Sequence, residues 1–207
     1  MNETEWLTGR SPNFLFDYVC RRSSARKARL FAVACARRVP ELLADDCCRQ
    51  AIELSEMYAD GLVPYSQLKG LFPDNAHPNT SELNAAWWCT RLGKVQAPQL
   101  VASFASAVVA VHRNHDFGRE LAAQAEIVRD IFRNPFHPVA FDPRWRTADA
   151  VGLARAIYED RAFERMPLLE DALMDAGCGD EQVIGHCRGG GQHVRGCWVV
   201  DLVLGKE

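Results

Sequence analysis

Apolar residues recur at intervals of three and four positions along most of the chain, with polar and charged residues between them. This spacing is typical of amphipathic α-helices, whereas a strand would require apolar and polar residues to alternate with a period of two. Such alternation is too short everywhere to predict a sheet. The pattern predicts helices over residues 13–22, 24–39, 45–60, 80–92, 100–111, 116–132, 147–158, 166–176 and 180–186, and a last element over 193–204.

Helix-capping residues support several of these boundaries. Ser11 precedes Pro12, and a serine N-cap followed by proline in the first turn is a typical helix start. Ser24 and Thr147 stand at the same position before two further helices. The last element is ambiguous, because its three valines suit a strand while the 193/197 spacing suits a helix. We expect a helix.

Turn-forming residues interrupt the pattern at two places. Residues 70–80 (GLFPDNAHPNT) contain two prolines and two asparagines and predict a flexible surface loop. Residues 133–146 contain three prolines and predict an ordered arm. We expect Phe136, Phe141 and Trp145 of this arm to be largely buried against the helices, because burying apolar side chains is favourable.

Together these elements predict one all-α domain over residues 1–207. A length of 207 residues is compatible with a single domain. We expect a helical bundle of about eight helices, with the proline- and aromatic-rich arm wrapped on its surface.

Composition narrows the class of protein further. The chain is 48% hydrophobic and 25% charged, which is typical of a folded globular protein and not of a disordered one. Its 24 basic and 27 acidic residues give a net charge of −3. Because apolar runs are short and the first residues (MNETEW) are acidic, we expect neither a transmembrane helix nor a signal peptide, and a cytoplasmic location with reduced cysteines.

Four stretches of the chain carry a resemblance to other proteins. They are RDIFRNPF (129–136), LARAIY (153–158), the tail from His186 to Lys206, which ends in HVRGCWVVDLVLGK, and residues 26–38. These stretches resemble an uncharacterised bacterial family of hypothetical proteins. In this family cysteines are common where the chain has Val33 and Ala36, which argues against a cysteine site on that helix. The resemblance implies that these stretches belong to one protein unit, and it implies no particular activity.

The tail also holds the densest group of possible metal ligands. His186, Cys187, His193 and Cys197 lie within twelve residues. On a helix, His193 and Cys197 would share one face, and the glycines between Cys187 and His193 are flexible enough to bring His186 or Cys187 back to them. With Cys178 as a further thiolate, this mixture of imidazole and thiolate suits tetrahedral Zn²⁺.

Two other interpretations of the tail remain open. The cysteines can simply pack as small apolar residues, with the histidines forming hydrogen bonds. Alternatively, Arg188, the glycines at 189–191 and Arg195 can form an anion seat at the start of a helix.

A basic stretch suggests a further partner. Residues 21–38 contain seven basic residues and no acidic one, and such a stretch can bind nucleic acid. Residues 41–60 are rich in acidic side chains, so we expect Arg26, Arg29 or Arg37 to pair with acids from other helices. Such pairing argues against nucleic-acid binding by this stretch.

No cofactor fingerprint and no paired set of catalytic side chains stands out in the sequence. We therefore expect a cytosolic, non-enzymatic interaction or regulatory module that binds a protein partner and no membrane. The alternatives are a zinc-binding protein, structural or catalytic, that uses the tail, and a nucleic-acid-associated regulator that acts through residues 21–38.

Overall fold

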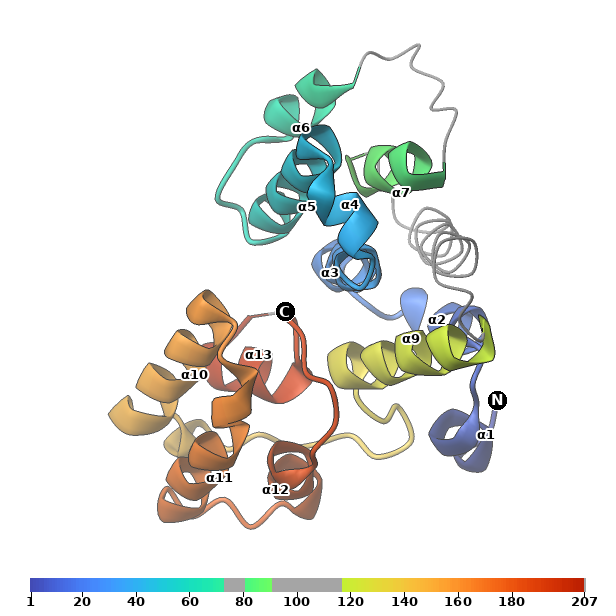
Figure 1. Ribbon diagram of the computed structural model, residues 1–207. Helices are drawn as coiled ribbons and strands as arrows, with labels where there is room; N and C mark the ends of the chain where they lie inside the picture. Colours follow the sequence, from blue (N-terminus) through green and yellow to red (C-terminus); the bar gives the residue numbers. More distant parts are fainter. Residues whose placement is uncertain (73–80, 91–116, 207) are drawn as a thin grey trace. The chain divides into compact units, whose positions relative to one another are not determined.

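All regular structure in the described part of the chain is helical (Figure 1). The computed structural model describes residues 1–72, 81–90 and 117–206. The all-α prediction is confirmed for these residues, which contain more helices than the eight expected. The helix predicted over 100–111 lies outside the described residues. Within the described ranges, no helix combines the length and apolar character needed to cross a bilayer.

The chain divides into two compact units, residues 1–128 and 129–207. The prediction of a single domain over residues 1–207 stays a prediction. The first unit contains α1 (Glu3–Thr8), α2 (Pro12–Cys20), α3 (Ala25–Arg37), α4 (Pro40–Ala44), α5 (Asp46–Ala59), α6 (Tyr65–Leu71), α7 (Ser81–Thr90) and most of α9 (Phe117–Phe132). The second contains the end of α9, then α10 (Ala148–Asp160), α11 (Met166–Asp175), α12 (Glu181–Arg188) and α13 (Trp198–Leu204).

The predicted N-caps form as expected. Ser11 accepts a hydrogen bond from the backbone N–H of Phe14, and Pro12 occupies the first helical turn. Ser24 and Thr147 cap α3 and α10 in the same way. These caps satisfy backbone N–H groups that have no partner within the helix, so local sequence sets where these helices begin.

Buried hydrogen bonds join three helices of the first unit. Arg29 on α3 donates to the carbonyl of Cys89 on α7 at 2.8 Å, and Ser55 on α5 donates to the same carbonyl at 2.7 Å. The basic stretch pairs with acids as expected: Arg26 with Asp60 at 3.1 Å and Arg37 with Glu56 at 3.0 Å.

The prediction of a loop over residues 70–80 is wrong for its first two residues. Gly70 and Leu71 belong to α6, a helix that the sequence pattern did not indicate, because its apolar positions are few. Leu68 of this helix is fully buried, so packing against the unit stabilises a segment with weak local signals. Residues 73–80 lie outside the described residues.

The second unit has its own apolar core. Residues from α10, α11, α12 and α13 form it, among them Ile157, Leu169, Leu173, Val183, Trp198 and Val199. Phe141 and Trp145 of the arm pack against this core and meet each other edge to face at 5.2 Å. Phe136, Phe141 and Trp145 are half-buried, less than the predicted large burial. Phe141 and Trp145 cover the core from outside and keep one side toward solvent.

The last element is a helix, as expected, but it is shorter. The prediction placed it over 193–204, whereas α13 begins at Trp198. His193 and Cys197 therefore precede the helix.

Candidate metal centre

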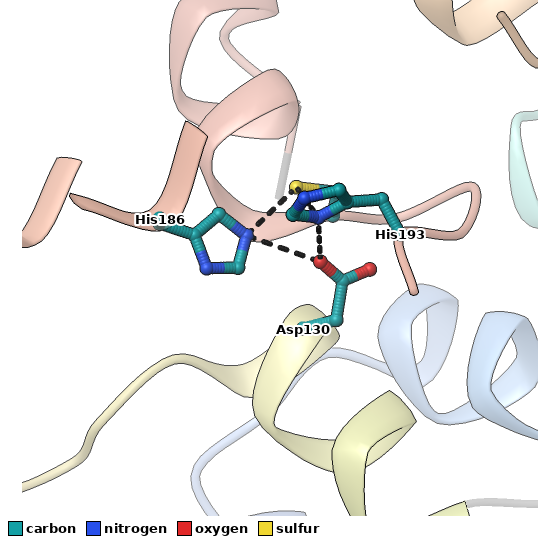
Figure 2. Close-up of side chains that lie close together, drawn as sticks. Asp130, His186 and His193 are labelled. Atoms are coloured by element: carbon teal, nitrogen blue, oxygen red, sulfur yellow. Dashed lines mark hydrogen bonds and ion pairs between the residues drawn. The ribbon is translucent and has the colours of Figure 1, made fainter. Parts of the chain in front are cut away.

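Four potential metal ligands lie together in the second unit. They are Asp130 in the last turn of α9, His186 in the last turn of α12, and His193 and Cys197 in the segment between α12 and α13. One donor atom from each residue lies within 4.8 Å of the donor atoms of the other three. Figure 2 shows both imidazole rings turned toward the carboxylate of Asp130.

One nitrogen of each ring faces the other ligands, Nε2 in His186 and Nδ1 in His193. Nε2 of His186 lies 3.1 Å from Oδ1 of Asp130 and 3.2 Å from the sulfur of Cys197. Nδ1 of His193 lies 2.7 Å from the same Oδ1 and 3.9 Å from the same sulfur. Two nitrogens, one oxygen and one sulfur thus converge on a common point, which is the arrangement of ligands around one cation.

A tight turn brings His193 and Cys197 together. The backbone N–H of Cys197 donates to the carbonyl of Val194 at 2.9 Å, and Gly196 has a φ of 96°. A positive φ at the third residue is characteristic of a type II turn, and it favours glycine. The prediction that a helical turn joins His193 and Cys197 is therefore wrong, although the two side chains do meet.

Asp130 is held in a fixed orientation. Its Oδ2 accepts a hydrogen bond from the backbone N–H of Val194 at 2.8 Å, which leaves Oδ1 for the two histidines. Burial alone would raise the pKa of Asp130, but the hydrogen bonds and charges of His186 and His193 outweigh burial and lower it. The carboxylate is therefore ionised at neutral pH although its residue is buried.

The histidines and the carboxylate stabilise each other electrostatically. Burial alone would lower the pKa of His193, but its hydrogen bond to Asp130 outweighs burial and raises the pKa. A carboxylate only accepts hydrogen bonds, so in the metal-free chain the ring nitrogens that face Asp130 carry hydrogens. A bound cation would replace these hydrogens.

The remaining sides of the two rings are also enclosed. The ring of His186 lies 5.0 Å from the ring of Trp198, centroid to centroid. Nε2 of His193 is buried and forms no hydrogen bond within the described residues. The nearby backbone of Gly189 contributes to the raised pKa of this ring. Such contacts fix the orientation of a ligating imidazole.

Cys197 is fully buried. Burial raises the pKa of its thiol well above the ordinary value, and the charge of Asp130 raises it further. A catalytic cysteine has a lowered pKa and some exposure to substrate, so Cys197 does not have the properties of a nucleophile. The thiol is instead placed as a ligand or as a packed residue.

The structure brings together three of the four tail residues that the sequence indicated: His186, His193 and Cys197. Cys187 is absent from the group. It packs in the apolar core, where burial raises the pKa of its thiol to about 12. Cys178, the expected further ligand, also packs in this core.

The ligand that the sequence reasoning missed is Asp130. One signal was available, because Asp130 follows Ile127 by three positions and so shares the apolar face of its helix. An acidic residue on a buried face requires a partner, and this observation alone could have marked it.

The anion seat proposed for the glycine turn lacks its main elements. The helix that was expected to begin there starts only at Trp198. Arg188 donates to Glu170 at 3.0 Å, so its charge is matched within the unit.

Comparison of the chain with protein-family models, with curated proteins and with solved structures gives no match.

Proposed function

We propose that the chain is a zinc-binding protein, with one structural Zn²⁺ held by Asp130, His186, His193 and Cys197. The observation that carries this proposal is the convergence of four donor atoms within 4.8 Å of one another. These ligands come from the end of α9, the end of α12 and the segment before α13, so the metal would join three parts of the second unit.

The distances suit a tetrahedral zinc ion. Zinc–nitrogen and zinc–oxygen bonds of about 2.1 Å place two such ligand atoms about 3.4 Å apart at tetrahedral angles, and a zinc–sulfur bond of about 2.3 Å places nitrogen and sulfur about 3.6 Å apart. Four of the six donor–donor separations run from 2.7 to 3.9 Å, and all six are within 4.8 Å. Shifts of up to about an ångström would bring the four atoms to tetrahedral positions around the ion.

The donor types favour zinc over other common cations. Mg²⁺ and Ca²⁺ prefer oxygen ligands, whereas two imidazoles and one thiolate are typical of Zn²⁺. The carboxylate and the thiolate together would supply two negative charges, which neutralise the ion in a buried site.

Two features favour a structural role over a catalytic one. All four positions of a tetrahedron would be filled by protein ligands, whereas catalytic zinc keeps one position for water or substrate. Cys197 is fully buried, and the side chains of Asp130 and His193 are 4% and 7% exposed, so solvent reaches the site mainly beside His186, which is 20% exposed.

A cysteine–histidine–aspartate catalytic set is the second candidate, and the geometry argues against it. In such a set the histidine contacts the nucleophile with one ring nitrogen and the carboxylate with the other. Here a single nitrogen of His186 contacts both Asp130 and Cys197. Ring nitrogens that converge on one point suit a cation and do not suit a proton relay.

A structural ion would stabilise the second unit directly. Metal-binding free energy becomes folding free energy when the unfolded chain has no preformed site, and structural zinc contributes on the order of 10 kcal/mol. A rigid zinc-stabilised unit is compatible with the predicted role in binding a protein partner, which stays a prediction.

Metal analysis of the untagged, purified full chain tests the proposal. We expect close to one zinc per chain, and Co²⁺ substituted for zinc should show the visible absorption bands of a tetrahedral site with a thiolate ligand. His193→Ala removes one ligand and should lower the zinc content. His137→Ala, which removes an exposed histidine outside the group, is the matched control and should keep one zinc per chain. Zinc content below about a tenth of an equivalent after zinc reconstitution would exclude the site.

A further inference from the structure

We propose that metal occupancy holds the metal loop, residues 189–196 between the end of α12 and Cys197, in place, and that metal loss releases this loop while the flanking helices stay packed. The inference rests on the proposed zinc site and adds a conformational consequence to it.

The exposed part of the metal loop is mostly glycine. Residues 189–192 are all exposed, and the first three of them are consecutive glycines. A Cβ atom added to Gly190 or Gly191 would meet no atom within 4 Å, so these residues pack against nothing at that point. Glycine also loses more conformational freedom on ordering than any other residue.

Asp130 is the main anchor for both ends of the exposed stretch. His186 before the stretch and His193 after it both contact Oδ1, and the backbone N–H of Val194 donates to Oδ2. A cation at this point would bind both histidines and Cys197 at once, so it would close the loop at its base. Without the cation, the carboxylate of Asp130 is the group that contacts residues on both sides of the exposed stretch.

The elements on either side have independent anchors. Val183 and Cys187 of α12 are buried in the apolar core, as are Trp198, Val199 and Val200 of α13. Within the loop, Arg195 donates to the carbonyl of Tyr158 at 3.2 Å and stacks over its ring. Metal loss should therefore free the residues between Arg188 and Val194 and leave the helices in place.

Amide hydrogen exchange of the full chain, read by mass spectrometry, tests the inference. The zinc-loaded protein is compared with the same protein after chelation and after zinc is restored. We expect the amides of Val194 and Cys197, whose hydrogen bonds lie at the site, to exchange at least about tenfold faster without zinc, because local opening breaks these bonds. Amides of α10 and α11 serve as the internal control and should be accelerated much less than those of the loop. Cys197→Ser should behave like the chelated protein even with zinc present.

The outcomes separate the inference from the function on which it rests. If one zinc binds per chain but exchange of the metal loop does not change, the loop inference is wrong and the zinc site stands. If chelation accelerates exchange in α10 and α11 as much as in the loop, release is global and the inference is again wrong. If no zinc binds, the proposed function fails and the inference fails with it.

Discussion

Nδ1 of His193 lies 2.7 Å from Oδ1 of Asp130, although 63 residues separate the two in the chain. The contact brings the last turn of α9 to the segment before α13 within the second unit. It places one ring nitrogen and one carboxylate oxygen close to the donor atoms of His186 and Cys197. The site therefore depends on tertiary packing, and each of its members can be tested separately.

Cys197 and Cys187 provide the first test, because both are buried thiols in the same core and only Cys197 belongs to the ligand group. Cys197→Ala should lower zinc affinity at least about 100-fold, since it removes a direct ligand. Cys187→Ala should keep one zinc per chain and lose only about 1 kcal/mol of stability. Competition with a chromophoric chelator measures both affinities, and equal losses would point to a different ligand set.

Asp130→Asn should also weaken zinc binding by at least about tenfold. Asparagine can still accept the hydrogen bond from Val194, but it loses the negative charge and the strong oxygen ligand. Asp171→Asn, at an exposed position of α11, is the control and should bind zinc normally. Normal zinc affinity in the Asp130 variant would remove this residue from the site.

Gly196→Ala should disturb the turn that joins His193 to Cys197. A side chain at a φ of 96° is strained, and we expect a loss of about 1–3 kcal/mol together with weaker zinc binding. Gly190→Ala is the matched control, because a Cβ there meets open space. Thermal unfolding of both variants, with and without zinc, measures their stabilities. Equal stabilisation of the two variants by zinc would show that the turn plays no part in placing the ligands.

Zinc binding should release protons. Burial raises the pKa of the Cys197 thiol well above its ordinary value, so the metal-free protein carries this proton at pH 7, whereas zinc binds the thiolate. Apparent zinc affinity should therefore rise with pH, about tenfold per pH unit for each proton released. Calorimetry in two buffers of different ionisation enthalpy counts these protons, and a count of zero would show that no thiol is deprotonated.

In the first unit, Arg38 and Glu120 form a two-bonded ion pair, with both nitrogen–oxygen distances at 2.9 Å. Glu120 is 6% exposed and Arg38 is 22% exposed, so solvent screens the pair only in part. Glu120→Gln should lower the free energy of unfolding by about 1–3 kcal/mol. The control is Arg49→Gln, which breaks an exposed pair with Asp46 and should change this free energy by less than about 0.5 kcal/mol. Urea unfolding measures both values, and equal losses in the two variants would show that burial does not strengthen the Arg38–Glu120 pair.

Local signals predicted the helices well where caps and apolar spacing agreed. Ser11, Ser24 and Thr147 begin α2, α3 and α10 as expected, because capping depends on residues a few positions apart. α6 was missed because tertiary burial of Leu68 stabilises it more than its local sequence does.

The site was predictable only in part. His186, His193 and Cys197 were found because they cluster in sequence, although the reason given for the last two was a helix and the structure has a turn. Asp130 lies 56 residues before His186, and no local pattern joins positions so distant. Cys187 was included because it is next to His186, but adjacent residues on a helix point in directions about 100° apart, and Cys187 enters the core.

The separation of 56 residues between Asp130 and His186 also bears on the order of folding. Closing such a long loop costs chain entropy before any contact is gained, so these contacts form late. α10, α11 and most of α12 lie between the two ligands and can pack on one another first. A metal that binds after this packing does little to start folding. Such a metal would act on a nearly finished structure by slowing its unfolding, so it would set how long the second unit lasts once formed.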